Sequence, residues 1–403
     1  MTALRSVLQA IAEATPAVRR FFLGCLLLGT GAAFLEVLLT LYLQEEGLPK
    51  NRIGDILALR AVGTVLGAMV AGPLLSRQPV RRVLAGASVL AAAALVAIVE
   101  VRSDGARQAA AALFGFAITF RIVGSGPFLF RQGSERWMSM LFGIDAAILA
   151  ATQVAGSALA GGAFALFREL GTGAAGAYRG ALLSGACLIA LSLLPYLRIE
   201  ERAAVELHGE KAKDGSLPLR LALRLCVPFF LVGAGAGLTI PYLNLYFEDR
   251  FSTPAPHIAV LYAGVAATTT LGFLLSPWLA RRFGLVRSVV GAELLSVPWV
   301  LVLAWSTRFD LSAAAFLIRG AFMNLPYPLY NQLIMRVVAP EQRERANALT
   351  KLAWNASWVV TAWIAGAMLE RFGNNYVPTM LTTACFYVSA SCSFWIFFRR
   401  TGL

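Results

Sequence analysis

The stretch FFLGCLLLGTGAAFLEVLLTLYLQEEG, residues 21–47, decides the fold. It is apolar over more than the roughly 20 residues that an α-helix needs to cross the hydrocarbon core of a bilayer. One carboxylate, Glu36, lies well inside it. Because an ionisable group inside a membrane span is costly, Glu36 is a candidate functional residue. The stretch therefore predicts a transmembrane helix with a functional acid in its interior.

The same pattern returns in the second half of the chain. Four residues of the stretch have gap-free counterparts at an offset of 204 residues: Gly29, Gly31, Tyr42 and Leu43 align on Gly233, Gly235, Tyr246 and Phe247. A long-period repeat of a hydrophobic segment indicates that one structural unit occurs twice. We therefore interpret the chain as two copies of one membrane unit.

Composition supports an integral membrane protein. The 403 residues are 58% hydrophobic and only 14% charged, and the mean hydropathy is +0.69, whereas about a quarter of a soluble domain is charged. The net charge of +13 would suggest a nucleic-acid partner in a soluble protein, but here the charges lie between apolar spans, so we expect none. The five cysteines lie within apolar segments in no metal-like spacing, which argues against a metal site or a disulfide framework.

Apolar runs of about 20 residues predict an all-α membrane fold with twelve transmembrane helices in two six-helix repeats. The first six spans are 20–43, 53–75, 80–99, 108–130, 138–167 and 177–197. The second six are 222–247, 257–280, 286–305, 311–335, 346–369 and 376–398. The polar stretch 198–220 reads as a cytoplasmic linker between an N-terminal half, 1–197, and a C-terminal half, 221–403.

The charge distribution predicts the orientation. If the N-terminus is cytoplasmic, 22 of the 35 Lys and Arg residues lie in inner segments and 9 in outer ones. Positive residues concentrate on the cytoplasmic side of membrane proteins. We therefore expect a multi-pass protein of the plasma membrane, the inner membrane in a bacterium, with both termini in the cytoplasm.

Two loops carry a sequence motif. Gly72-Pro-Leu-Leu-Ser76-Arg77-Gln-Pro79-Val-Arg81-Arg82 follows the second span, and Pro277-Trp-Leu-Ala-Arg281-Arg282-Phe-Gly284-Leu-Val-Arg287 follows the eighth at an offset of 205. Both resemble the cytoplasmic loop of the major facilitator superfamily, Gly-x-Leu-Ala-Asp-Arg-x-Gly-Arg-Arg. The span count, the linker and the repeat agree with this resemblance over nearly the whole chain.

The resemblance implies a transporter with alternating access, and it implies roles for several residues. The family's loop aspartate is replaced by Ser76 in the first copy and by Arg281 in the second. Arg121-Ile-Val-Gly124-Ser-Gly126 resembles the arginine and glycines of the family's fourth span. We expect gating or loop roles for Gly72, Ser76, Arg77, Arg81, Arg82, Arg281, Arg282, Gly284, Asp145 and Lys351.

Seven charged residues lie well inside the spans, away from their ends: Glu36, Arg60, Arg121, Asp145, Glu293, Arg319 and Lys351. Each costs about 2.5–3.5 kcal/mol at mid-helix and should face a partner or water. The family places spans 1, 4, 7 and 10 around the cavity, which favours Glu36, Arg121 and Arg319. For Asp145 and Lys351 an inter-helix contact is favoured over substrate contact, and Glu293 lies in a span that is peripheral in the family.

Glu36 and Arg60 lie at equal depth, about 10 Å from the outer ends of consecutive helices, so they can meet. Two interpretations remain open: a permanent buried ion pair, or a proton-coupling site in which Glu36 is freed in one conformation.

Polar residues in spans 7 and 10 are further candidates for a cavity lining. They are Tyr242, Asn244, Tyr246, Asn324, Tyr327 and Asn331. In span 10, Pro326 and Pro328 also interrupt the helical hydrogen bonding.

No enzymatic or ATP-binding motif is present in the sequence, so we expect neither catalysis nor a cofactor, and uphill transport must use an ion gradient or exchange. The favoured function is proton-coupled efflux of an amphipathic or hydrophobic compound. One alternative is uptake or exchange of an organic anion or other polar metabolite, suggested by Arg121 and Arg319. Another is a membrane sensor that transports nothing. The expected partners are a small-molecule substrate, protons and the lipid bilayer, and we expect a monomer.

Overall fold

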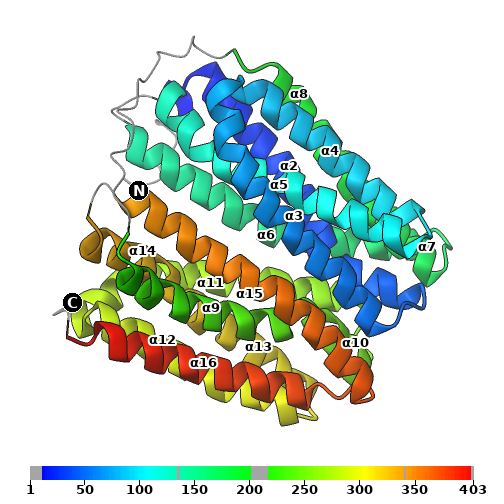
Figure 1. Cartoon of the computed structure of the whole chain (residues 1–403). Coiled ribbons are helices and arrows are strands. Elements are labelled where there is room, and N and C mark those ends of the chain that lie inside the picture. The colour runs from blue at the N-terminus through cyan, green and yellow to red at the C-terminus, as the bar shows by residue number, and fades with distance from the viewer. Residues whose placement is uncertain (1–10, 134–136, 201–216, 340–341, 401–403) are drawn as a thin grey trace. The chain divides into compact units, whose positions relative to one another are not determined.

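A computed structural model describes residues 11–133, 137–200, 217–339 and 342–400, except the side chains of residues 76, 139 and 344. Throughout these ranges the regular structure is helical (Figure 1). The N-terminal half forms α2 (Pro16–Glu45), α3 (Lys50–Arg77), α4 (Val80–Glu100), α5 (Asp104–Gln132), α6 (Met138–Glu169), α7 (Ala174–Leu191) and α8 (Leu193–Leu197).

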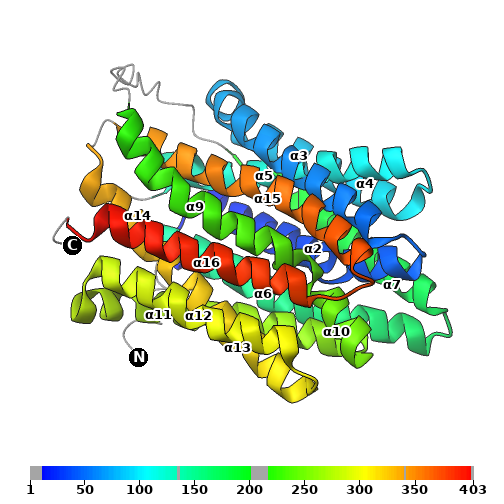
Figure 2. The ribbon, with the colours of Figure 1, turned by 60° about the horizontal axis from the view of Figure 1, so that its bottom comes forward.

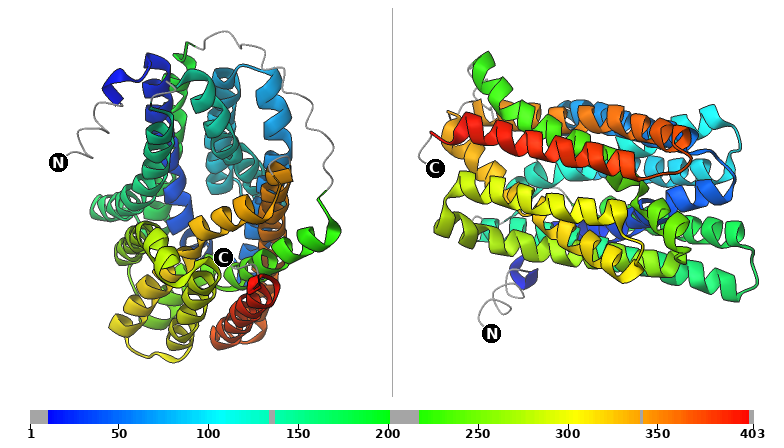
Figure 3. Two further views of the ribbon diagram at one scale, coloured as in Figure 1. Left: turned by 90° about the vertical axis from the view of Figure 1, so that its left-hand side faces the viewer. Right: turned by 90° about the horizontal axis from the view of Figure 1, so that it is seen from below.

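The C-terminal half follows the same plan. Its elements are α9 (Leu219–Thr239), the 3-10 turn η2 (Ile240–Tyr242), α10 (Leu243–Phe251), α11 (Ala255–Phe283), α12 (Leu285–Trp305), α13 (Phe309–Asn324), α14 (Pro326–Val337), α15 (Arg343–Arg371) and α16 (Val377–Phe398). Within each half the helices run roughly along one direction, as the right view of Figure 3 shows. The predicted all-α membrane fold is confirmed.

Span 10 differs from the prediction in one respect. In the described residues, eleven segments are long and apolar enough to cross a membrane, and the predicted span 311–335 is not among them. It is divided at Leu325 into α13 and α14. Pro326 begins α14, and its ring cannot donate the backbone hydrogen bond that would continue α13. The tenth span is therefore two short helices that meet at a break.

The chain clusters into two compact units. The N-terminal unit comprises Met1–Glu46 and Leu59–Leu207, and the C-terminal unit comprises Gly47–Ala58 and His208–Leu403. The start of α3 thus clusters with the C-terminal unit.

The repeated glycines lie where helices approach one another closely. A Cβ atom on Gly29 would lie 2.7 Å from a side-chain atom of α6, and one on Gly31 would lie 2.5 Å from a backbone oxygen of α7. In the second unit, a Cβ atom on Gly233 would meet α15 at 2.3 Å, and one on Gly235 would meet α16 at 2.7 Å. Figure 2 shows α9 lying between α15 and α16. The sequence repeat thus reflects a repeated packing of the first helix of each unit between the fifth and sixth spans.

The repeated tyrosines make the same contact in both units. The Tyr42 hydroxyl donates to the carbonyl oxygen of Val99 at 2.8 Å, and the Tyr246 hydroxyl donates to that of Leu303 at 2.7 Å. Both tyrosines are buried. Each ties the first span of its unit to the end of the third, so this part of the repeat is structural.

Candidate functional site

Glu36 on α2 and Arg60 on α3 form a two-pronged ion pair. Arg60 Nη1 lies 2.5 Å from Glu36 Oε1, and Nη2 lies 3.2 Å from Oε2. Two parallel bonds between a guanidinium and a carboxylate fix the orientation of both groups, and they are stronger than single neutral hydrogen bonds. The structure therefore brings together the two residues whose equal depth suggested that they could meet.

Small residues hold Arg60 in place. A Cβ atom on Gly63 would lie only 1.9 Å from the backbone oxygen of Ala112 on α5, and one on Gly115 would lie 2.0 Å from the backbone oxygen of Arg60. Gly67, one turn beyond Gly63, makes a similar approach at 2.5 Å. Glycines four residues apart let membrane helices pack backbone to backbone. The position of the arginine is thus set by a tight crossing of α3 and α5.

The Glu36–Arg60 pair is open on one side. The Glu36 side chain is 47% exposed and that of Arg60 is 18% exposed. Because a charge facing hydrocarbon is costly, an exposed carboxylate inside a span should face water. The pair is therefore not fully enclosed in this structure. A group that water can reach can exchange a proton.

Arg121 on α5 lies in the interior of the N-terminal unit. Its Nη2 lies 3.3 Å from Asp145 Oδ1 on α6, and the two side chains are 6% and 17% exposed. The Arg121 Nε is buried and has no hydrogen-bond partner. Nearby, the Tyr196 hydroxyl contacts Cys25 Sγ at 3.6 Å. Asp145 therefore makes the inter-helix contact that was favoured for it, and Arg121 is not open to a substrate in this structure.

Arg319 on α13 occupies a comparable place in the C-terminal unit. It is 3% exposed, and its Nη2 donates a hydrogen bond to the Tyr387 hydroxyl on α16. The guanidinium carbon also lies 5.6 Å from the centre of the Tyr387 ring. As in Arg121, the buried Nε has no hydrogen-bond partner. The arginine is held by an aromatic residue and by no carboxylate in the described part of the chain.

Three of the predicted cavity residues belong to the core instead. Tyr242, Asn244 and Tyr246 are at most 1% exposed. The Tyr242 hydroxyl donates to the carbonyl oxygen of Ala362 at 2.9 Å, and Tyr246 makes the repeated contact described above. Asn244 Oδ1 accepts from the Leu245 backbone N–H at 3.0 Å. Polar groups that are buried and hydrogen-bonded in this way are not open to a ligand in this structure.

The other predicted cavity residues are exposed. Asn324, Tyr327 and Asn331 lie on either side of the break between α13 and α14. Asn324 Nδ2 donates to the carbonyl oxygen of Gly320 at 2.9 Å. Lys351, on α15, is exposed as well. These four side chains remain open to a ligand or to solvent.

The loop-motif residues lie at helix ends. Arg77 ends α3, Arg281 and Arg282 lie in the last turn of α11, and Arg81 and Arg82 begin α4. Gly284 has a backbone φ of +85°, a conformation that residues other than glycine rarely adopt, and it lies at the turn from α11 to α12. Gly72 lies in α3, where an added Cβ would meet nothing within 4 Å. The side chain of Ser76 lies outside the described part of the structure.

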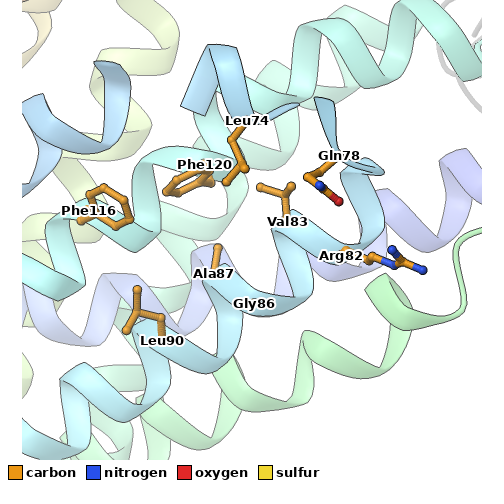
Figure 4. Close-up of a pocket in the computed structure, with 9 residues that line it drawn as sticks. All are labelled: Leu74, Gln78, Arg82, Val83, Gly86, Ala87, Leu90, Phe116 and Phe120. Atoms are coloured by element: carbon orange, nitrogen blue, oxygen red, sulfur yellow. The ribbon is translucent and has the colours of Figure 1, made fainter. Parts of the chain in front are cut away.

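One loop-motif residue, Arg82, borders a groove in the N-terminal unit (Figure 4). The groove has a volume of about 310 Å³. Its lining comes from α3, α4, α5 and the connection between α3 and α4: Leu74, Gln78, Arg82, Val83, Gly86, Ala87, Leu90, Phe116 and Phe120. The wall is apolar except for Gln78 and Arg82 at one end, and it includes neither Glu36 nor Arg60.

The sequence interpretation missed a polar cluster in the C-terminal unit, which includes the start of α3. Lys50 pairs with Asp249 on α10, and its Nζ donates to the Tyr376 hydroxyl at 2.9 Å. The Tyr376 hydroxyl donates to Asp249 Oδ2 at 2.6 Å. Burial, and then the Asp249 carboxylate, raise the pKa of Tyr376 well above its ordinary value, so the phenol stays a donor. These charges lie at span ends, where ordinary solvated loop charges also occur, so the sequence offered no signal for the cluster.

The chain is a multi-pass helical membrane protein with a repeated unit. The profile of the Major Facilitator Superfamily matches residues 21–306 and 225–402. The chain therefore belongs to this superfamily, as the loop motifs suggested. It is a secondary transporter that moves a small molecule, and it is not an enzyme.

Solved structures agree on the fold. The nucleoside transporter NupG matches with a TM-score of 0.79 and 14% identity, covering 96% of this chain and 100% of that one. A bacterial homologue of the lysosomal transporter Spinster, in an inward-facing and occupied conformation, matches with a TM-score of 0.76 and 15% identity over 95% and 96% of the chains. A D-xylose-proton symporter matches with a TM-score of 0.71 and 14% identity over 95% and 97%. No curated protein matches the chain in sequence.

Proposed function

We propose that this transporter exports a small amphipathic or hydrophobic compound from the cell in exchange for protons, and that Glu36 is the group at which proton binding and transport are coupled. The observation that carries the proposal is the half-exposed Glu36 carboxylate in the first span, paired with Arg60. An acid in this position can hold either Arg60 or a proton. The switch between these two states would couple the pH gradient to conformational change.

The arrangement of polar groups supports an amphipathic cargo over a strongly polar one. A polar metabolite needs several side chains that converge on it with free hydrogen-bonding groups. Of the six polar residues predicted to line a cavity in spans 7 and 10, Tyr242, Asn244 and Tyr246 are buried in the core, which leaves Asn324, Tyr327 and Asn331 open. Glu36, paired with Arg60, is the only charged residue of α2 between Phe21 and Gln44. A compound with one polar end and a large apolar body fits this inventory best.

Glu36→Gln should yield a folded protein that no longer couples transport to pH. Glutamine imitates the protonated acid at nearly the same volume, so the neutral state becomes permanent. The measurement is efflux of a lipophilic fluorescent dye from proteoliposomes under an imposed pH gradient. Glu100→Gln is the matched control, because Glu100 forms a similar two-pronged pair with Arg179, at 2.8 and 2.6 Å, but lies at the end of α4. The control should retain coupling.

Two outcomes would count against the coupling site. Wild-type pH dependence in a well-folded Glu36→Gln protein would remove Glu36 from this role. An unfolded Glu36→Gln protein that is rescued by Arg60→Gln would show that the pair serves structure, because the second change removes the uncompensated charge.

A second candidate function is uptake or exchange of an organic anion. The buried Nε groups of Arg121 and Arg319 support it, since each arginine keeps one unused donor. An anion reaching either site in another conformation could use that donor. Counterflow of a labelled carboxylate in the same proteoliposomes, without dye efflux, would favour this function over the first.

Both termini and the linker 198–220 are proposed to lie in the cytoplasm, because the inner segments carry most of the Lys and Arg residues. A reporter enzyme that is active only outside the cytoplasm should be inactive when fused after Arg400 and active when fused in the loop that holds Gly47. The reverse pattern would invert the proposed orientation, and with it the assignment of Glu36 to the outer half of the membrane.

A further inference from the structure

A second membrane-embedded acid, Glu293 on α12, lies in the C-terminal unit. Its side chain is fully buried, with 0% exposure. Oε1 accepts a hydrogen bond from the Tyr330 hydroxyl on α14, and Oε2 accepts one from Ser391 Oγ on α16 at 2.8 Å. The Tyr330 ring packs 4.5 Å from Phe229 and 5.3 Å from Phe394, measured between ring centres. The acid is therefore enclosed by hydroxyl groups and aromatic rings.

No cation compensates this carboxyl group within the described residues. The helices packed against α12 are α11, α13, α14 and α16. Most of their charged residues are exposed: His257, Arg281 and Arg282 on α11, Asp310 on α13 and Arg336 on α14, as is Arg287 on α12 itself. The exception is Arg319 on α13, which is turned to Tyr387. Tyr330 and Tyr387 are the titratable groups that interact with Glu293, and Tyr387 lies one turn from Ser391 on α16.

An ionised carboxylate in this place would lack both water and a counter-charge. Two hydroxyl donors cannot replace the hydration that an ion loses when it enters an apolar core. The neutral acid satisfies the same neighbours, because its own O–H can donate to one hydroxyl oxygen while its carbonyl oxygen accepts from the other. The enclosed state is therefore the protonated one.

The N-terminal unit shows that the fold does not require an acid here. Ser88 aligns with Glu293 at the offset of 205 that relates the two loop motifs. Ser88 is also fully buried, and its hydroxyl accepts a hydrogen bond from Ser192 at 2.9 Å. Where the third and sixth spans cross, the N-terminal unit thus has a hydrogen bond between two neutral serines. The C-terminal unit has a hydrogen bond between an acid, Glu293, and a serine, Ser391. Packing alone does not explain Glu293.

The residue that closes the acid, Tyr330, follows the break in the tenth span. Tyr330 is carried by α14, which is separated from α13 at Leu325. We propose that Glu293 is a proton-binding site that is closed by Tyr330, and that movement of α14 about this break admits water, to which the Glu293 carboxyl group releases its proton. The proposal extends the proposed function, and it rests on that function only for the use of the proton in transport.

Infrared spectroscopy of the full-length protein in liposomes tests the site without a known substrate. The wild type at neutral pH should show a carbonyl band of a protonated carboxyl group that is lost in Glu293→Gln and retained in Glu36→Gln. Tyr330→Phe, which removes one donor and keeps the acid, should shift the band. This second variant keeps the test decisive if Glu293→Gln does not fold.

Exchange into D2O tests the opening. The band should shift as the acid proton is replaced by deuterium. Pro326→Ala restores a backbone donor at the break and should slow this exchange about two- to tenfold, the factor that one regained hydrogen bond gives. Pro277→Ala in α11, a helix that continues through its proline, should leave the rate unchanged. Absence of the band, or a band that never exchanges, would overturn the proposal, whereas loss of dye coupling in Glu36→Gln would stand independently of either result.

Discussion

Asp145→Asn is expected to destabilise the N-terminal unit by about 3–5 kcal/mol, the usual cost of removing one partner of a buried ion pair. The change leaves the Arg121 guanidinium inside the unit with a neutral neighbour. Asp145 is the only carboxylate among the described residues that interact with this guanidinium, so the substitution removes its counter-charge. Thermal and denaturant unfolding of the purified protein would measure the loss.

The double variant Asp145→Asn/Arg121→Gln provides the critical comparison. It removes both charges, so it should regain most of the stability lost by the single variant. Asp310→Asn is the matched control at the surface, because Asp310 pairs with Arg308 while both side chains are more than 60% exposed. It should leave unfolding unchanged. A single variant as stable as the wild type would show that water reaches Arg121 and that the arginine is available to a ligand.

The fold could be predicted because the bilayer restricts the possibilities. A chain in hydrocarbon must satisfy its backbone hydrogen bonds internally, so each apolar run had to be a helix. The predicted span 311–335 is the exception, because the structure divides it into two helices. The sequence predicts one helix there, although Pro326 interrupts its backbone hydrogen bonding. The start of α3 could not be assigned to the C-terminal unit, because its partners Asp249 and Tyr376 lie far away in the sequence.

The contact between Glu36 and Arg60 was predictable because it depends on how deep in the membrane each residue lies. Glu36 and Arg60 lie on consecutive helices at equal distance from one membrane surface. The short loop between the helices keeps the two residues close enough to form the ion pair. The helix faces of the seventh span were not predictable in the same way. Tyr246 was identified as a repeated residue and also as a cavity candidate, but a repeat cannot show whether the hydroxyl meets a ligand or the carbonyl oxygen of Leu303.

Gly63→Ala is expected to disrupt both the N-terminal unit and the Glu36–Arg60 pair. The new methyl group would lie 1.9 Å from the backbone oxygen of Ala112, and a backbone atom cannot rotate away as a side chain can. Helices α3 and α5 must therefore separate, at a cost above the about 1–3 kcal/mol typical of overpacking. Because Arg60 lies one turn before Gly63, the separation also draws its guanidinium away from Glu36.

Gly72→Ala isolates this effect. Gly72 lies on the same helix, but a methyl group there would meet nothing within 4 Å. Both substitutions raise helix propensity by about 1 kcal/mol at most, so a difference between them reports the crossing with α5. We expect Gly63→Ala to lose folded protein and Gly72→Ala to match or exceed the wild type in stability. If low temperature partly restores folding of Gly63→Ala, the folded protein should show weakened pH-coupled dye efflux, because Arg60 no longer binds the Glu36 carboxylate. Equal stability and equal coupling in the two variants would show that the close crossing of α3 and α5 does not set the position of Arg60.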